Sequence, residues 1–275
     1  MLNHSVCFIG AGAMAEAIIE GLIKKKTLSP QQIAVVNKSN RHRLEALGAK
    51  YGVVADPERK NELIHQADIL ILAMKPKDVR ASLTEIKPFT HHRQIIISVV
   101  AGMATQLITE LLGHSAPVIR TMPNTSARIG LSATAVAPGA YAQEEHLQIA
   151  NTILESIGEV FLVEEELLDG ITGLSGSGPA YIYYFVEAMI KGGMDVGLSA
   201  EQAYRLSLQT LVGAAMMLKL TGENPSQLRE QVTSPNGTTA KGLSVLQSYR
   251  FEEAIRAAIH QAAERSIQWL QQANG

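Results

Sequence analysis

The sequence lacks the residues that disulfide, metal or nucleic-acid chemistry would require. Its only cysteine is Cys7, inside an apolar run, so a disulfide framework and a cluster of thiolate metal ligands are excluded. The eight histidines are scattered without metal-ligand spacing, and we predict no metal site. Because the formal net charge is −2 and no run of basic residues occurs, we expect no nucleic-acid partner and no attraction to an anionic membrane.

Long apolar segments are also missing. No uninterrupted apolar run reaches the length of a membrane span. The N-terminal segment has no positively charged start, and Gly10 and Gly12 interrupt its apolar stretch, so it is a poor signal peptide. A reducing, cytoplasmic location is therefore expected. Hydrophobic residues make up 46% of the chain and charged residues 18%, so it can bury the core of one large or two ordinary domains.

The first part of the chain alternates short apolar runs with amphipathic stretches. The apolar runs predict strands over residues 5–9, 33–37, 69–74, 95–100, 117–122 and 131–137. The amphipathic stretches predict helices over residues 13–25, 41–50, 76–86 and 105–112. This alternation is typical of the α/β class, with a doubly wound parallel sheet.

The strand signal largely disappears near Glu164. Long helical patterns cover residues 179–196, 200–221 and 251–273. The pattern around residues 206–220 is apolar on nearly all sides, as in helices that pack against a partner subunit. We interpret the acidic run 164–166 as surface groups. The sequence thus predicts a first domain over residues 1–163 and an all-α domain over residues 164–275.

A dinucleotide signature follows the first predicted strand. Gly10-Ala11-Gly12-Ala13-Met14-Ala15 has the pattern G-x-G-x-x-A and opens the first predicted helix. The first glycine allows a tight turn, the second lets the backbone approach a pyrophosphate, and the last small residue allows close packing. We therefore predict that Gly10, Gly12, Ala13 and Met14 bind the cofactor, against the alternative of a plain glycine-rich turn.

The end of the second predicted strand indicates which cofactor is used. Enzymes that use NAD usually carry Asp or Glu there to bind the ribose 2′-hydroxyl. This chain has Asn37, Lys38, Ser39 and Asn40, followed by Arg41 and Arg43. Amide, hydroxyl and guanidinium groups suit a 2′-phosphate. We predict NADPH, with NADH as a weaker possibility. A solvated basic helix start is the alternative.

Two further segments follow strands where ligands bind in such sheets. Ala73, Lys75 and Pro76 come after the strand over residues 69–74, and Lys75 can reach a phosphate or ribose. Asn124 follows a later strand and is predicted to bond the nicotinamide region. The alternatives are a surface lysine and an Asx-turn.

A loop rich in hydroxyl groups precedes an apolar helical pattern near residue 240. Its candidate substrate-binding residues are Ser234, Asn236, Gly237, Thr238 and Thr239. Backbone N–H groups at a helix start lack intrahelical partners and favour an anion, so a small carboxylate would fit. A dinucleotide site at one end of the chain and a small-anion site at the other outline a reductase. A helix cap and turn is the alternative.

The sequence resembles the pyrroline-5-carboxylate reductase family along nearly its whole length. The resemblance is carried by residues 8–14, 73–76, 120–125 (Arg-Thr-Met-Pro-Asn-Thr), 172–181 (Thr-Gly-Leu-Ser-Gly-Ser-Gly-Pro-Ala-Tyr) and 233–242. It implies an NADP-binding Rossmann domain and a helical substrate-binding and dimerisation domain. Such subunits form dimers, which sometimes assemble into decamers.

The resemblance also implies residue roles. The substrate, a small imino acid, would lie at the dimer interface near residues 234–239, and Thr239 would act catalytically by hydrogen-bonding the ring nitrogen. Asn236 stands where the family often has glycine, and Thr238 where alanine is common, so either threonine hydroxyl is a candidate. The implied reaction is NADPH-dependent reduction of 1-pyrroline-5-carboxylate to L-proline. The alternatives are reduction of a related cyclic imine or keto acid, and a non-catalytic NADP(H)-sensing regulator.

Overall fold

The computed structural model describes residues 2–274, with side chains up to residue 268. Two compact units are present. The first runs up to Ser177 and takes up the chain again from His260, and the second is Gly178–Ile259. The two units are defined by contacts between residues, and they do not divide the chain at the predicted boundary between residues 163 and 164. That boundary stays a prediction.

The first unit is built on one sheet. Over the described residues its order is β2-β1-β3-β4-β5-β6-β7. The strands are β1 (Val6–Ile9), β2 (Ile33–Val36), β3 (Ile69–Leu72), β4 (Ile95–Ser98), β5 (Val118–Met122), β6 (Ser132–Pro138) and β7 (Gly158–Leu162). Pairing is parallel from β2 through β5, whereas β6 runs antiparallel to β5 and parallel to β7. The carboxyl ends of β1 to β5 therefore share one edge.

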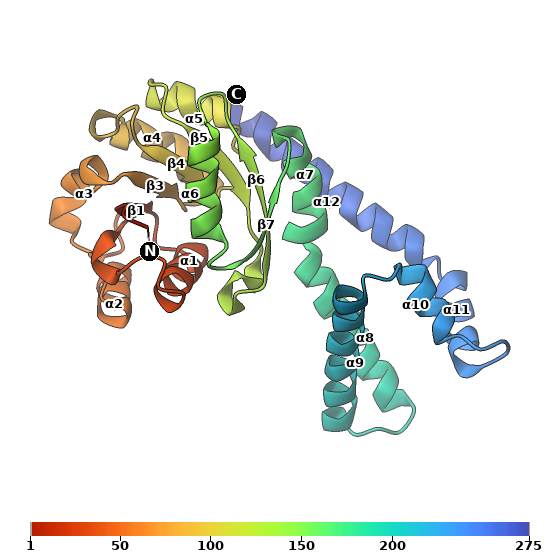
Figure 1. Ribbon diagram of the computed structural model, residues 1–275. Helices are drawn as coiled ribbons and strands as arrows, with labels where there is room; N and C mark the ends of the chain where they lie inside the picture. Colours follow the sequence, from red (N-terminus) through yellow and green to blue (C-terminus); the bar gives the residue numbers. More distant parts are fainter. Residues whose placement is uncertain (1, 275) are drawn as a thin grey trace. The chain divides into compact units, whose positions relative to one another are not determined.

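Helices cover both faces of this sheet (Figure 1). The α-helices of the first unit are α1 (Ala13–Lys24), α2 (Arg41–Tyr51), α3 (Lys60–Gln66), α4 (Val79–Ile86), α5 (Thr105–Leu112), α6 (Glu144–Leu154) and α7 (Leu168–Ile171). Alternate residues of β1 point to opposite sides, so that Val6 and Phe8 pack with α1, α2 and α6 while Cys7 and Ile9 pack with α3, α4 and α5. The result is the three-layer, doubly wound architecture that the alternating pattern predicts.

Short turns connect these elements. They are η1 (Pro30–Gln32), η2 (Pro57–Arg59), η3 (Pro76–Asp78), η4 (Lys87–Phe89), η5 (Thr125–Ile129), η6 (Glu165–Leu167) and the π-helical turn η7 (Thr172–Gly176). Proline is the first residue of η1, η2 and η3, a position at which a backbone N–H would make no hydrogen bond within the helix. The π-turn continues α7 directly toward the second unit.

Four helices and strands of the first unit were not predicted from the sequence. They are α3, α6, the single turn α7 and the edge strand β7. Of the residues of β7, Glu159, Phe161 and Leu162 are exposed. An edge strand that is neither alternating nor fully buried carries a weak sequence signal, which explains why β7 was not predicted.

The second unit consists of helices. They are α8 (Gly178–Asp195), α9 (Ala200–Thr221), α10 (Pro225–Gln231), α11 (Thr238–Ser248) and the first part of α12 (Phe251–Asn274). The predicted start and stop of α9 are present: Ser199 and Gln202 form a capping box, and Gly222 ends the helix with φ +66°. Over the described residues, no helix is long and apolar enough to cross a bilayer.

The second unit has almost no apolar core of its own. Among its described residues Ala203 is the one fully buried apolar side chain. Large apolar side chains lie exposed on its helices and in the turns that follow them, among them Tyr183, Tyr184, Val196, Leu206, Leu220 and Tyr249. So large an exposed apolar surface marks a protein–protein interface.

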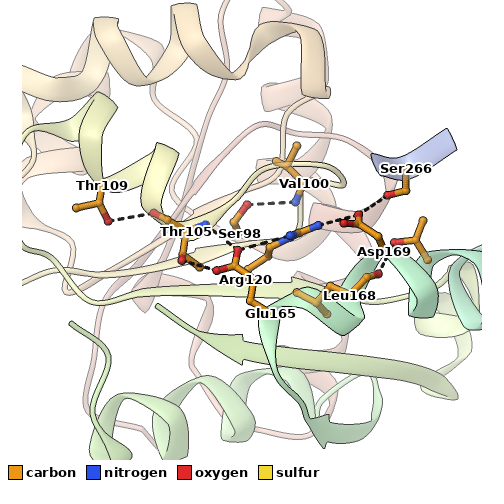
Figure 2. Close-up of polar contacts among 10 residues, drawn as sticks. Ser98, Val100, Thr105, Thr109, Arg120, Glu165, Leu168, Asp169 and Ser266 are labelled. Atoms are coloured by element: carbon orange, nitrogen blue, oxygen red, sulfur yellow. Dashed lines mark hydrogen bonds and ion pairs between the residues drawn. The ribbon is translucent and has the colours of Figure 1, made fainter. Parts of the chain in front are cut away.

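A buried ionic network ties five elements of the first unit together (Figure 2). Arg120 of β5 is 4% exposed and contacts Asp169 of α7 at 3.2 Å and Glu165 of η6 at 3.5 Å. Ser266 of α12 donates to the same Asp169 oxygen at 2.7 Å. Glu165 also accepts from the backbone N–H and hydroxyl of Thr105 at the start of α5, at 2.8 and 2.6 Å.

The network corrects the interpretation of the acidic run as surface groups. That interpretation is wrong for Glu165, which is half-buried and pairs with Arg120, although Glu164 and Glu166 are exposed. A carboxylate near a helix start is favoured by the free N–H groups and the dipole of α5. The run of three glutamates looks uniform in sequence, but only its middle member turns inward.

Removing the buried cation should be far more costly than removing an exposed one. We expect Arg120→Met to lower the free energy of unfolding by about 3–5 kcal/mol, because Asp169 and Glu165 lose their counter-charge where water cannot replace it. Arg41→Met is the control: it deletes the exposed Arg41–Glu58 pair and should cost less than about 1 kcal/mol. Denaturant unfolding at one fixed protein concentration measures both. Equal losses would show that the network adds nothing.

Candidate cofactor and substrate sites

The glycine turn after β1 brings backbone within reach of a phosphate. Gly10 has φ +119°, and a Cβ there would lie 2.5 Å from the carbonyl oxygen of Ala73, so no other residue fits. Gly12 is the N-cap of α1 and has no side-chain cap. The first N–H groups of α1, those of Ala13 and Met14, are therefore available to an anion.

A cavity of about 520 Å³ opens beside this turn at the carboxyl ends of β1, β2 and β3. Seven predicted cofactor residues line it: Gly10, Gly12, Asn37, Lys38, Ser39, Ala73 and Lys75. Four others, Ala13, Met14, Arg41 and Pro76, do not line it, and neither does Asn124. The structure thus brings residues from three separate sequence segments into one cavity.

The cavity is strongly basic. Five cationic side chains line it against two carboxylates, those of Asp78 and Glu85. Lys38, Arg43 and Lys75 were named from the sequence, whereas Lys60 and Lys77 were missed. Lys60 is paired with Glu85 at 2.6 Å. The sequence alone does not show which lysines of α3 and η3 face the cavity. Lys60 and Lys77 therefore could not be predicted as cavity residues.

No carboxylate stands at the end of β2, where NAD enzymes usually place one. The Asn37 amide shapes the loop instead: its Nδ2 donates to the carbonyl oxygen of Asn40 at 2.8 Å, and its Oδ1 accepts from the Asn40 N–H at 3.1 Å. Lys38 and Ser39, which follow, are exposed and line the cavity. These residues fit a cofactor that carries a 2′-phosphate.

Arg43 rather than Arg41 lies at the glycine turn. Arg41 pairs with Glu58 at 2.6 Å on the surface. Arg43 donates from Nε to the carbonyl oxygen of Ala11 at 2.9 Å and pairs with Glu16 of α1. Hydrogen bonds from Arg43 and then from Lys50 lower the pKa of the Glu16 carboxyl to about 2. The predicted role of Arg41 at the cofactor stays a prediction.

Two predicted residues shape loops at neighbouring strand ends. Lys75 is the N-cap of η3, with Pro76 as its first residue. Asn124 caps η5: its Oδ1 accepts from the N–H of Ser126 at 3.1 Å, which is the Asx-turn alternative. Its Nδ2 also donates to the carbonyl oxygen of Ser175 at 3.1 Å. A nicotinamide contact of Asn124 stays a prediction.

The hydroxyl-rich loop forms a tight turn at the start of α11, in the second unit. Gly237 donates its N–H to the carbonyl oxygen of Ser234 at 3.0 Å, and Asn236 has φ +58°. This left-handed backbone suits glycine, and asparagine is among the few residues with a side chain that tolerate it. A Cβ on Gly237 would lie 2.3 Å from the Ser234 hydroxyl oxygen.

Thr238 and Thr239 are the first two residues of α11, and both are exposed. Gly237, the N-cap, has no side-chain cap. Among the described residues neither threonine hydroxyl has a hydrogen-bond partner. Free N–H groups and free hydroxyls therefore stand together, an arrangement suited to a small carboxylate beside a polar atom. The substrate-binding role of these loop residues stays a prediction.

Taken together, the doubly wound sheet, its glycine turn and the basic cavity define a dinucleotide-binding oxidoreductase with a separate helical unit. Residues 5–102 match the family model described as NADP oxidoreductase coenzyme F420-dependent. Residues 165–269 match the model described as pyrroline-5-carboxylate reductase dimerisation. The chain belongs to the pyrroline-5-carboxylate reductase family, as the sequence resemblance predicts.

Known proteins resemble the chain along nearly its whole length. Pyrroline-5-carboxylate reductase 1 of Bacillus spizizenii is 46% identical over 96% of this chain and 89% of its own. The structure of a pyrroline-5-carboxylate reductase from Coxiella burnetii has a TM-score of 0.90 at 33% identity, covering 98% and 99% of the two chains. The Plasmodium falciparum enzyme, solved with NADP bound, has a TM-score of 0.87 at 27% identity, covering 98% and 99%.

These similarities confirm the predicted fold class, the oxidoreductase assignment and the NADP-type cofactor. The matched dimerisation domain also explains the exposed apolar side chains of the second unit, because self-association covers such a surface.

Proposed function

We propose that this chain catalyses the NADPH-dependent reduction of 1-pyrroline-5-carboxylate to L-proline, the last step of proline biosynthesis. The observation that carries the proposal is the 46% identity, over 96% of the chain, to a protein named pyrroline-5-carboxylate reductase 1. The basic cavity and the hydroxyl-bearing start of α11 support it independently, because they suit the two ligands that this reaction needs.

The glycine turn and the cavity are proposed to hold the cofactor. The N–H groups of Ala13 and Met14 would bind the pyrophosphate, and Lys38 and Ser39 the 2′-phosphate. When bound, NADPH supplies the hydride. β5 lies three strands beyond β1 in the sheet, about 14 Å away at the usual strand spacing. The loop after β5 is thus placed to border the far end of an extended dinucleotide.

The start of α11 is proposed to hold the substrate. Its free N–H groups and the Ser234 hydroxyl would bind the carboxylate, with Asn236 and Gly237 shaping the turn. The Thr239 hydroxyl would hydrogen-bond the ring nitrogen. The C=N carbon gains the hydride and the nitrogen keeps or gains a proton. An alcohol is too weak an acid to supply that proton alone, so it comes from water or from the protonated substrate.

Self-association is proposed to complete the site. The predicted cofactor residues belong to the first unit and the substrate loop to the second. We propose that a dimer, formed through the apolar surface of the second unit, is the functional form, and that dimers assemble into a decamer as in some members of the family. The division of labour between residues 1–163 and residues 164–275, and a cytoplasmic location, belong to the same proposal.

Purified protein mixed with NADPH and pyrroline-5-carboxylate should oxidise the cofactor and form proline. The fall in nicotinamide absorbance and the proline formed, measured together, should agree mole for mole. Faster reduction of a six-membered cyclic imine acid or of a keto acid would move the assignment to a related reductase. Tight NADPH binding with no turnover of any of these substrates would favour the regulator.

A negative charge at the end of β2 should discriminate between the two cofactors. We expect Asn37→Asp to raise the KM for NADPH by about tenfold or more, equivalent to about 1.4 kcal/mol, because a carboxylate repels the 2′-phosphate. The KM for NADH should change much less. Asn61→Asp, on the exposed face of α3 outside the cavity, controls for added charge. Equal effects on both cofactors would contradict the assignment.

The two threonines can be separated by single substitutions. We expect Thr239→Ala to lower kcat/KM for the imine by roughly 10- to 100-fold, the range for a lost hydrogen bond to a charged group. NADPH affinity should stay unchanged, and Thr239→Ser should restore most of the rate. Thr238→Ala is the matched control, one position away on the same exposed helix start. A larger loss in Thr238→Ala would transfer the role to Thr238.

A further inference from the structure

The loop after β5 runs beside the segment formed by α7 and the π-turn η7. Both segments belong to the first unit. A π-turn is rare and tends to occur at functional sites. In this one the N–H of Ser177 donates to the carbonyl oxygen of Thr172 at 2.8 Å, five residues back. The turn belongs to the segment 172–181 through which the chain resembles its family, yet none of the roles assigned above uses it.

Contacts at both ends fasten these two segments together. At the start of α7, Asp169 contacts Arg120 of β5 at 3.2 Å, as Figure 2 shows. At the far end, Asn124 Nδ2 donates to the carbonyl oxygen of Ser175 at 3.1 Å. Next to Ser175, Gly176 faces Met122, since a Cβ on Gly176 would lie 2.7 Å from the Met122 methyl carbon. The turn is therefore held along the carboxyl end of β5.

The amide of Asn124 makes both contacts, which an ionised carboxylate cannot do. Its Oδ1 must accept from the N–H of Ser126, and its Nδ2 must donate to the Ser175 carbonyl. A carboxylate can do the first and not the second, because it has no hydrogen to donate. The two hydroxyls of the turn point elsewhere: Thr172 and Ser175 donate to the carbonyl oxygens of Leu168 and Ile171. Asn124 is thus the side-chain donor that ties the turn to the β5 loop.

We propose that Asn124 is a positioning residue for the reaction, which acts through the Ser175 carbonyl by holding the π-turn against the carboxyl end of β5. The inference rests on the proposed function, since the carboxyl edge of the sheet is where the cofactor and the reacting carbon would meet. A turn held in one position gives this edge of the sheet a fixed shape before any ligand binds. Loss of the Asn124–Ser175 hydrogen bond should affect the geometry of the reaction more than the affinity for the cofactor, because the cavity at β1 to β3 is unchanged.

The test compares Asn124→Asp and Asn124→Ser with the wild-type chain. Both substitutions keep an oxygen that can cap η5. The ionised aspartate has no hydrogen to donate to Ser175, and the shorter serine side chain has a single hydroxyl, which cannot cap η5 and reach the Ser175 carbonyl at once. In the ligand-free protein, amide hydrogen exchange over residues 172–177 should accelerate roughly tenfold, the expected effect of one lost hydrogen bond, with exchange over η5 unchanged. With substrates, kcat should fall roughly tenfold or more, while the Kd for NADPH changes by less than about threefold.

Acidification provides a rescue. The carboxyl introduced by Asn124→Asp regains a donor when protonated, so its excess exchange over wild type should shrink as pH falls through about 4, whereas that of Asn124→Ser should not.

Each contrary result overturns a stated part. Unchanged exchange in the turn would show that the hydrogen bond from Asn124 to Ser175, here called the clamp, does not hold the turn. Faster exchange with unchanged kcat would show that the clamp has a structural role only. A tenfold rise in the Kd for NADPH with unchanged exchange makes Asn124 a direct cofactor ligand. If the wild-type chain fails to reduce the imine, the proposed function fails, and the exchange measurement still decides whether the clamp exists.

Discussion

The buried charge of Arg120 constrains more of the first unit than any other side chain described above. A guanidinium that is 4% exposed needs acceptors, and it finds them in Glu165 of η6 and Asp169 of α7, which follow the sheet in sequence. Asp169 in turn accepts from Ser266, so that α12 is fastened to the same point. A guanidinium carries several N–H donors in one plane, so it can bind two carboxylates at once. One cation thus sets where β5, α5, α7 and α12 meet.

The same element positions the chemistry. β5 carries Arg120 in its middle and opens at its carboxyl end into the Asn124 loop. The far side of the sheet edge carries the glycine turn, whose helix start is left uncapped. The second unit has the same feature at α11, where Gly237 is the N-cap and leaves the first N–H groups free. Both proposed anion sites are therefore helix starts from which a capping side chain is missing, and a glycine stands at each N-cap.

Sequence reasoning predicted the central strands because they are buried on both faces and read as continuous apolar runs. It failed at β7, which lies at the edge, and at α3 and α6, whose patterns are short or interrupted. It found the glycine turn, Lys38 and Lys75, because each follows a strand directly. It named Arg41 and Arg43 together without showing that Arg43 is the one that reaches the cavity. It missed Lys60, because the approach of that side chain depends on how α3 packs, and it missed the inward turn of Glu165 within a uniform acidic run.

The helical unit shows why fold and activity are inseparable in this chain. Burial of apolar area is the main favourable term in folding, and among the described residues of this unit one apolar side chain, Ala203, is fully buried. Helices with such surfaces gain their stability from a partner rather than from each other. The loop proposed to bind the substrate stands at the start of α11, within that unit. If self-association stabilises these helices, it also holds that loop in place, and under the proposed function the formation of the substrate site is then coupled to dimerisation.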